Sequence, residues 1–217
     1  MRSAEFYDAY LAAVLAADRR EAIAVLRRAE TEGLGLAAIY LEVLQPALRE
    51  IGRLWQENEI SVADEHLATA ISQSAMARLY DGNAAVTSAG GRSLIAACAD
   101  VERHEVGLRM ICDLLELEGW ATAYLGGSVP IDSLISIIQK KRPDVLLLSV
   151  ALSLHLPRLR AMIRALRDAL GQECPLILVG GRPFIDRPDL AVRVGADFSA
   201  NGPAEAIALL AQQFAAV

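Results

Sequence analysis

The sequence contains no uninterrupted apolar run of about 18 residues, the length that a membrane-spanning helix requires. Its first residues also lack the apolar core of a secretion signal. Lys140 and Lys141 are its only lysines, and the net charge of −6 argues against the basic surface that direct nucleic-acid binding requires. We therefore expect a soluble cytoplasmic protein without a membrane or nucleic-acid partner.

Cysteine is scarce too. Cys98, Cys112 and Cys174 are odd in number, form no Cys-x-x-Cys pair and lie in or beside apolar segments. This pattern favours buried free thiols in a reducing compartment over disulfides. The 217 residues, 54% of them hydrophobic, leave room for one large domain or two modest ones.

The first part of the chain repeats apolar residues at helical spacing. The periodicity predicts four helices, at residues 3–17, 20–32, 36–57 and 61–80. Pro46 lies inside the third, where we expect a kink. Ser61 and Asp64 have the spacing of a capping box that starts the fourth. Four helices with short connections predict a bundle over residues 1–82.

Residues 83–92 interrupt the periodicity and are rich in small side chains, which favours a linker. Strands and helices then alternate over residues 93–217. The expected strands are 93–99, 121–125, 144–149, 176–179 and 197–200, and the expected helices are 106–118, 131–141, 157–170, 188–194 and 203–215. This alternation predicts an α/β domain with a five-stranded parallel sheet, flavodoxin-like or Rossmann-like, covered on both faces and with its ligand at the switch point of the strand order.

Three of these strand ends carry residues suited to a binding site. His104 follows the first strand, with Glu102 two residues before it, and the pair is typical of a metal ligand and the carboxylate that orients it. Ser149 ends the third strand, and Gly180-Gly181 ends the fourth. Taken singly, these residues are equally explained by a loop histidine, a strand-end cap and an ordinary turn.

Taken together, they resemble the cobalamin-binding domain of the methionine synthase and methylmalonyl-CoA mutase superfamily, whose pattern is Asp-x-His-x-x-Gly, then Ser-x-Leu, then Gly-Gly at these intervals. Glu102 replaces the aspartate and Ala151 replaces the leucine. The resemblance implies that His104 binds cobalt from below in place of the cofactor's own base, oriented by Glu102. It also implies a cofactor-binding set that comprises Arg103, Glu105, Val106, Gly107, Ser149, Ala151, Ser153, Gly180 and Gly181.

Within that set, the resemblance gives Ser149 a hydrogen bond to the displaced base, and Gly180 and Gly181 a bare backbone against which the nucleotide tail lies. His155 also follows the third strand. We expect it to be a solvated loop histidine, with an approach to the site as the alternative.

The helical part carries a second pattern, Trp55 followed by nine residues and then Glu65-His66. It resembles the helix-bundle lid of light-sensing, adenosylcobalamin-binding transcriptional regulators, in which these residues surround the adenosyl group. The alternative is a tryptophan packed at a helix end and a polar pair near a helix start. In the best-known form of those regulators a second histidine follows the tryptophan, whereas this chain has Gln56. A photoproduct with two histidines on cobalt is therefore not expected, unless His66 serves.

These resemblances imply a cobalamin-dependent photoreceptor or sensor rather than an enzyme. Adenosylcobalamin is the expected form and methylcobalamin the alternative, and some related light sensors also hold a bilin such as biliverdin. We expect no DNA-binding domain, so that the signal passes to another copy of the chain in a homo-oligomer or to a separate partner. The alternative function is a corrinoid protein that carries methyl groups for a methyltransferase, and a third is a scaffold with a degenerate site.

Overall fold

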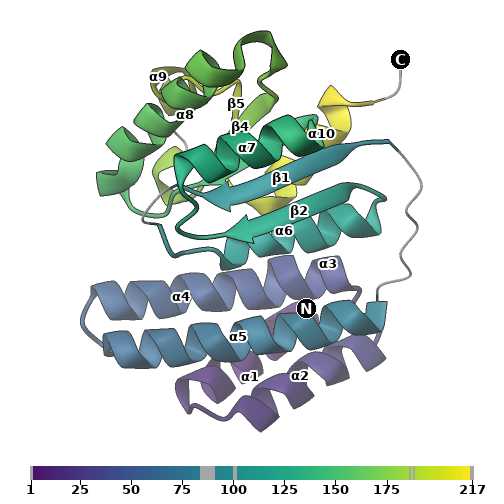
Figure 1. The fold of residues 1–217 in the computed structure, drawn as a ribbon. Helices are drawn as coiled ribbons and strands as arrows, with labels where there is room; N and C mark the ends of the chain where they lie inside the picture. Colours follow the sequence, from purple (N-terminus) through teal and green to yellow (C-terminus); the bar gives the residue numbers. More distant parts are fainter. Residues whose placement is uncertain (1, 84–90, 100–101, 186, 188, 216–217) are drawn as a thin grey trace. The chain divides into compact units, whose positions relative to one another are not determined.

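The computed structural model describes residues 2–83, 91–99, 102–185, 187 and 189–215. The chain divides into two compact units, Met1–Ala85 and Val86–Val217, and each is described by itself (Figure 1). Most of the expected linker, residues 84–90, lies outside the described residues.

The first unit is helical, as predicted. Its elements are α1 (Arg2–Leu15), α2 (Arg19–Thr31), α3 (Leu36–Ala38), the π-helix η1 (Ile39–Leu44), α4 (Gln45–Gln56) and α5 (Val62–Asn83). Helices α1, α4 and α5 pack against one another and α2 packs on α1 and α5, so that apolar side chains from all four fill one core. Tyr10 is fully buried in this core, where its hydroxyl lies 2.8 Å from Oγ of Ser72.

The third predicted helix is continuous but changes type within its length. Pro46 has no N–H, and its ring clashes with the carbonyl four residues earlier in a regular α-helix. The segment Ile39–Leu44, just before it, is π-helical, and the N–H of Gln45 donates to the carbonyl of Tyr40, five residues back. A π-helical segment therefore stands where the sequence predicts a kink.

The second unit has the predicted α/β architecture. Its strands are β1 (Ser93–Cys98), β2 (Ala121–Gly126), β3 (Val145–Ser149), β4 (Leu176–Gly180) and β5 (Phe198–Ala200). Its α-helices are α6 (Val106–Leu117), α7 (Ile131–Lys141), α8 (Leu156–Leu170), α9 (Asp189–Val194) and α10 (Pro203–Gln213), with short 3₁₀ turns at Ser153–His155, Gly171–Glu173 and Arg182–Phe184. All four strand pairings are parallel, in the flavodoxin-like order β2-β1-β3-β4-β5.

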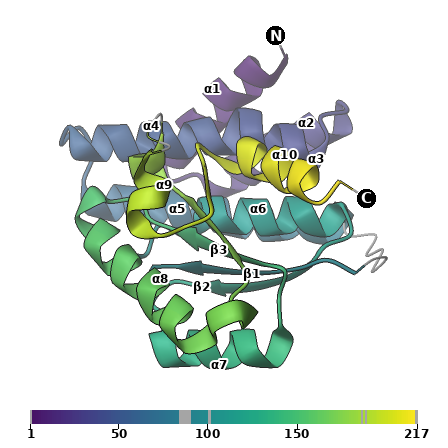
Figure 2. The ribbon, with the colours of Figure 1, turned by 90° about the horizontal axis from the view of Figure 1, so that it is seen from above.

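Helices cover both faces of this sheet, which explains why its strands are almost continuously apolar. Ile95 and Ala97 of β1 belong to one core with residues of α7, α8 and α9. Leu94, Ala96 and Cys98 belong to the opposite core with residues of α6 and α10. Figure 2 shows α7 and α8 on one side of the sheet and α6 and α10 on the other.

The three cysteines are free thiols, as expected. Burial raises the pKa of Cys98 and of Cys112 to about 12, so both are protonated at neutral pH. Among the described residues, no helix combines the length and the apolar character needed to cross a bilayer.

Candidate functional site

The candidate site lies at the carboxyl edge of the sheet, where β1 and β3 are neighbours. Cys98, Ser149 and Gly180 are the last residues of their strands and stand in register across β1, β3 and β4. The chain leaves β1 toward α6 on one face and leaves β3 toward α8 on the other. This divergence is the topological switch point at which open α/β sheets bind ligands. The structure thus brings three predicted strand ends together.

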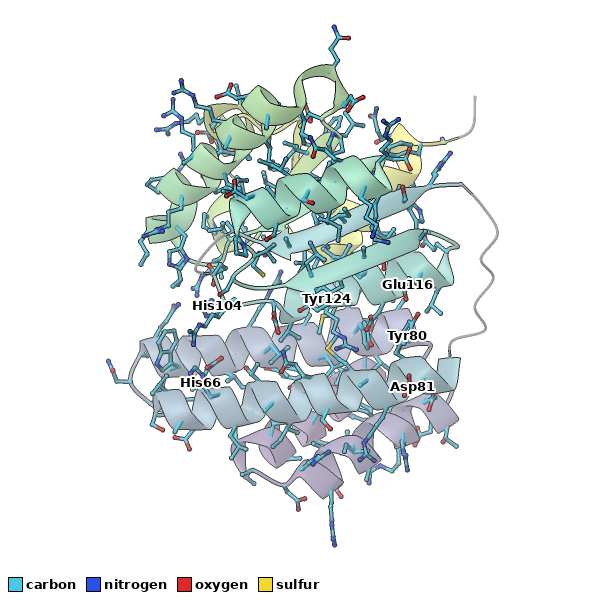
Figure 3. All side chains as sticks on the ribbon, in the orientation of Figure 1. His66, Tyr80, Asp81, His104, Glu116 and Tyr124 are labelled. Atoms are coloured by element: carbon cyan, nitrogen blue, oxygen red, sulfur yellow. The ribbon has the colours of Figure 1, made fainter. Side chains whose placement is uncertain are left out.

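His104 lies in the loop between β1 and α6, with 43% of its side chain exposed (Figure 3). Its Nδ1 is hydrogen-bonded to Oε1 of Glu102, which is fully buried. A carboxylate only accepts hydrogen bonds, so this contact places the ring proton on Nδ1 and the lone pair on Nε2. That tautomer suits a histidine that binds a metal through Nε2.

Glu102 also accepts backbone hydrogen bonds from two loops. Its Oε1 accepts from the N–H groups of Arg103 and His104, at 2.9 and 3.1 Å. Its Oε2 accepts from the N–H groups of Ala151 and Leu152 in the loop after β3, at 2.8 and 3.2 Å. Burial by itself would raise the pKa of Glu102, but its hydrogen bonds, first with His104 and then with Ala151 and His155, outweigh burial and hold the pKa well below its usual value. The buried carboxylate is therefore ionised, and it joins the loops on both sides of the switch point.

The structure corrects the prediction that His155 is a solvated loop histidine. It is 9% exposed rather than solvated, and its Nδ1 lies 3.0 Å from Oε2 of Glu102. The 3₁₀ turn Ser153–His155 places the ring there, because a buried carboxylate must be surrounded by donors. The alternative that His155 approaches the site is the correct one. Its position six residues after the end of β3 is the signal in the sequence.

Glu105 connects the same loop to the end of β2 through hydrogen bonds. Its Oε2 accepts the N–H of Gly127 at 3.0 Å, and it is hydrogen-bonded to the hydroxyl of Tyr124. Burial, followed by the charge of Glu105, raises the pKa of Tyr124 well above its usual value, so this phenol remains a neutral donor. Sequence reasoning missed these partners, and the signal for them in the sequence is the pair Gly126-Gly127, which directly follows the expected strand 121–125.

The glycines of the predicted site have different explanations. Gly181 has φ +111°, and a Cβ there would lie 1.8 Å from the carbonyl oxygen of Val150. The fold itself therefore requires this glycine. Gly107 is exposed near the start of α6, and a Cβ there would have no atom within 4 Å. No neighbouring atom requires glycine at that position, although glycine weakens a helix by about 1 kcal/mol relative to alanine.

The remaining predicted site residues lie at the carboxyl edge of the sheet and differ in how exposed they are. Val106 is buried at the start of α6, Ser149 and Ala151 are half-buried, and Arg103 and Ser153 are exposed. A Cβ at Gly180 would lie 3.4 Å from the carbonyl oxygen of Ala200. Arg103 and Ala151 take part in the carboxylate network through their backbone N–H groups.

In the helical unit, Glu65 and His66 form a pair near the start of α5. Nδ1 of His66 is hydrogen-bonded to Oε2 of Glu65, whose Oε1 accepts the hydroxyl of Thr69 at 3.0 Å. The side chain of His66 is 75% exposed, against 16% for Glu65. Trp55 is half-buried in the last turn of α4, the helix that packs against α5, and Gln56 is exposed.

The predicted capping box is confirmed at the start of α5. The N–H of Ser61 donates to Oδ2 of Asp64 at 2.9 Å, and the N–H of Asp64 donates to Oγ of Ser61 at 3.2 Å. The hydroxyl of Ser61 also donates to Oδ2 of Asp64, at 2.6 Å, and this hydrogen bond, followed by that from the N–H of Ser61, lowers the pKa of Asp64. The cap fixes the first turn, in which Glu65 lies.

The fold and the edge site define a class: a flavodoxin-like α/β protein that has, at its switch point, a histidine hydrogen-bonded to a buried carboxylate, and that has a helical unit before it in the chain. Two family models, both described as "B12 binding domain", match residues 7–80 and 92–210. The second match covers more than half of the chain. The chain therefore belongs to the B12 binding domain family, and this membership supports cobalamin binding.

Relatives of two kinds are similar to the chain. The HTH-type transcriptional repressors CarH and CarA of Myxococcus xanthus are both 34% identical to it, over 140 and 142 residues. The match covers 64% of this chain but only 46% and 45% of those proteins, so the chain spans less than half of their length. Dimethylamine corrinoid protein 1 of Methanosarcina acetivorans is 22% identical over 96% of this chain and 97% of that protein.

Among solved structures, the monomethylamine corrinoid protein of Methanosarcina barkeri has the same fold. It superposes with a TM-score of 0.83 at 17% identity, over 97% of this chain and 99% of that chain. The relatives named here are transcriptional repressors and corrinoid proteins, in agreement with the expectation that the chain is not an enzyme.

Proposed function

We propose that the chain binds cobalamin with Nε2 of His104 as the lower ligand of cobalt, and that it works as a cobalamin-dependent light sensor. Bound cobalamin supplies a cobalt ion whose upper organic ligand light can remove or whose methyl group a partner can take. One observation carries the assignment of His104: an exposed imidazole at the switch point has its Nδ1 held by a fully buried, ionised carboxylate.

The neighbouring residues fit a large ligand at this edge. The open space at Gly107 and the exposed ring of His104 would let the plane of a macrocycle approach the loop backbone. We assign the displaced base to Ser149 and the nucleotide tail to Gly180 and Gly181. The remaining contacts are assigned to Arg103, Glu105, Val106, Ala151 and Ser153.

For the helical unit we assign the upper ligand to Trp55, Glu65 and His66. An indole shields an organic group from water, and a carboxylate accepts hydrogen bonds from sugar hydroxyls. The preferred form is therefore adenosylcobalamin rather than methylcobalamin. A signal requires a ligand that binds two arrangements of the protein with different affinity, and the upper group is that ligand. The output is a change of homo-oligomer or of a separate partner.

Reconstitution with adenosylcobalamin in darkness, followed by spectra and size measurement before and after green light, tests the proposal. We expect a change in absorption together with a change in apparent mass. Unchanged spectra after illumination would rule out light sensing, and an absorption band beyond those of cobalamin would identify a second chromophore such as a bilin. The His104→Ala variant serves as the control for the lower ligand.

The second candidate is a corrinoid protein that carries methyl groups for a methyltransferase. One observation favours it: the similarity to the dimethylamine corrinoid protein extends over 96% of this chain, whereas the similarity to the repressors extends over 64% of it. Methylation of the bound cofactor by a methylamine and a partner methyltransferase, in darkness, would support this candidate. That the chain does not contact nucleic acid itself stays a prediction.

A further inference from the structure

We propose that Glu105 is a positioning residue for the lower ligand: its carboxylate holds the backbone that carries His104 against the turn after β2. Oε2 of Glu105 accepts the N–H of Gly127 at 3.0 Å, and the hydroxyl of Tyr124 donates to the same carboxylate. The loop that carries His104 is therefore held from two sides, by Glu102 toward the loop after β3 and by Glu105 toward the turn after β2. This inference rests on the proposed function for its purpose, but the contacts that carry it do not.

The place of Glu105 in the chain makes this use of its side chain informative. Glu105 is the N-cap residue of α6, where a side-chain oxygen usually accepts a free N–H of the first helical turn. Its side chain makes no such bond and is bonded to Gly127 instead. The carboxylate therefore does not stabilise the helix that begins there. It connects the residue after His104 to a different strand.

The turn after β2 packs tightly against this loop. Gly126 has φ +70°, and a Cβ there would lie 2.8 Å from Oε2 of Glu105. A Cβ at Gly127 would lie 2.7 Å from the carbonyl oxygen of Glu102. Both distances are shorter than an ordinary van der Waals contact. Glycine at both positions thus lets the turn approach the backbone on either side of His104.

The pairing of β1 with β2 brings the turn to this place. Ala96 of β1 pairs with Tyr124 of β2. The next residue, Ala97, pairs with Gly126, so that Leu125 is an extra residue on β2. Irregularities of this kind redirect side chains and end strand pairing beside binding sites. The tight turn therefore begins opposite Ala97, one residue closer to the end of β1 than an uninterrupted register would place it.

The fold offers a matched control at the other end of α6. Glu116, in the last turn of that helix, is half-buried like Glu105 and accepts the hydroxyl of Thr122 in β2. Glu116 thus also connects α6 to β2, but at the end of the helix opposite to His104 (Figure 3). Glu105→Leu and Glu116→Leu each remove one of these connections.

Two further variants change the contact with the turn in different ways. Glu105→Gln keeps a side-chain oxygen that accepts the N–H of Gly127. Gly127→Ala leaves the carboxylate in place but introduces a methyl group that the backbone of Glu102 must avoid. The loop that carries His104 is then displaced from the opposite side.

Two measurements report on the loop, one of them without cofactor. Hydrogen exchange of the cofactor-free protein follows the amides of His104 and Gly127, which donate to Glu102 and Glu105. Titration with adenosylcobalamin in darkness, followed by absorption, gives the affinity and the fraction of cofactor with a nitrogen base on cobalt.

We expect Glu105→Leu and Gly127→Ala to accelerate exchange at His104, to bind cobalamin about tenfold more weakly and to lower the base-on fraction. Glu105→Gln should retain the base-on fraction, with affinity within about threefold of the wild type. Glu116→Leu should lower stability but leave exchange at His104 and the base-on fraction unchanged. Circular dichroism identifies a variant that fails to fold; if Glu105→Leu does, the comparison of Gly127→Ala with Glu116→Leu decides.

The proposal is overturned if Glu105→Leu leaves exchange at His104 or the base-on fraction unchanged. It is also overturned if Glu116→Leu changes them equally, since equal changes mean a general loosening of α6. Weaker binding by Glu105→Leu beside normal binding by Gly127→Ala would mean that the carboxylate contacts the cofactor directly, and would overturn it too. Failure of the wild type to bind cobalamin would overturn the proposed function instead, and the exchange comparison would still decide whether Glu105 positions His104.

Discussion

Each of the two units contains a glutamate–histidine pair. The pairs share one hydrogen bond but differ in burial and in the other partners of the glutamate. In both, Nδ1 of the histidine is bonded to the carboxylate. Glu102 is fully buried and accepts from two loops of the α/β unit, whereas Glu65 lies on a helix and binds its sequence neighbour and Thr69. His104 is 43% exposed and His66 is 75% exposed.

The two pairs therefore differ in their surroundings and not in the residues that form them. A buried carboxylate interacts strongly with its donors because the local dielectric is low, and it fixes the partner ring. A pair on a helix surface competes with water and contributes little, as exposed ion pairs do. We therefore expect the first pair to support stability and cofactor binding, and the second to act only through contact with a bound ligand.

The largest expected effect is on stability. Glu102→Ala leaves buried N–H groups of two loops without their acceptor and should lower the free energy of unfolding of the α/β unit by about 3–5 kcal/mol. The matched variant Glu65→Ala should change stability by less than about 0.5 kcal/mol. Urea unfolding followed through the buried Trp120, with Trp55 replaced by phenylalanine, reads the α/β unit. Equal losses in the two variants would contradict the distinction between the pairs.

The next largest expected effect is on cofactor binding, in which His104 and His66 should contribute very differently. His104→Ala removes the proposed cobalt ligand, so affinity for cobalamin in darkness should fall by about 100-fold and the spectrum should shift to the base-off form. His66→Ala should retain the base-on spectrum, with affinity reduced no more than about threefold, because an exposed contact contributes little. Titration with adenosylcobalamin measures both. A base-on spectrum in His104→Ala would show that another residue binds the metal.

Acid should reduce the stabilisation that the pair Glu102–His104 contributes to the folded chain. The pKa of Glu102 is lower in the folded chain than in the unfolded chain, so the unfolded chain binds the proton first. The stabilisation is complete above the usual glutamate pKa of about 4.3 and is lost as the pH falls through the folded value. The difference in unfolding free energy between the wild type and Glu102→Gln should therefore shrink below about pH 4. A difference that stays constant between about pH 6 and pH 3, which lie above and below the usual glutamate pKa, would exclude this role.

Much of the fold could be predicted because its signals are local. Apolar periodicity and strand runs located the helices and strands, and the parallel order follows from their alternation. The capping box was predictable because Ser61 and Asp64 are three residues apart. The π-helix before Pro46 was not, since a kink and a change of helix type both relieve the same clash.

The site was predictable only in part, for the same reason. The neighbours Glu102 and His104 could be paired from their spacing, but His155 is 53 residues from Glu102 and contacts it only because β1 and β3 are adjacent. Likewise, the glycine pair suggested a ligand at Gly181, but the sequence did not reveal that the close approach of Val150 requires glycine there. Long-range contacts depend on strand order and register, which no local pattern contains.

The smallest effect concerns the start of the helix that carries the second pair. Ser61→Ala removes the reciprocal capping contact with Asp64 and should lower the stability of the helical unit by about 1 kcal/mol. The control Ser136→Ala, at an exposed position within α7, should be neutral or slightly stabilising because alanine favours a helix. Hydrogen exchange in the first turn of α5 measures the fraying directly. If Ser61→Ala frays that turn yet leaves cobalamin affinity unchanged, then Glu65 and His66 do not contribute to binding through a fixed geometry, and the contrast with the buried pair becomes sharper.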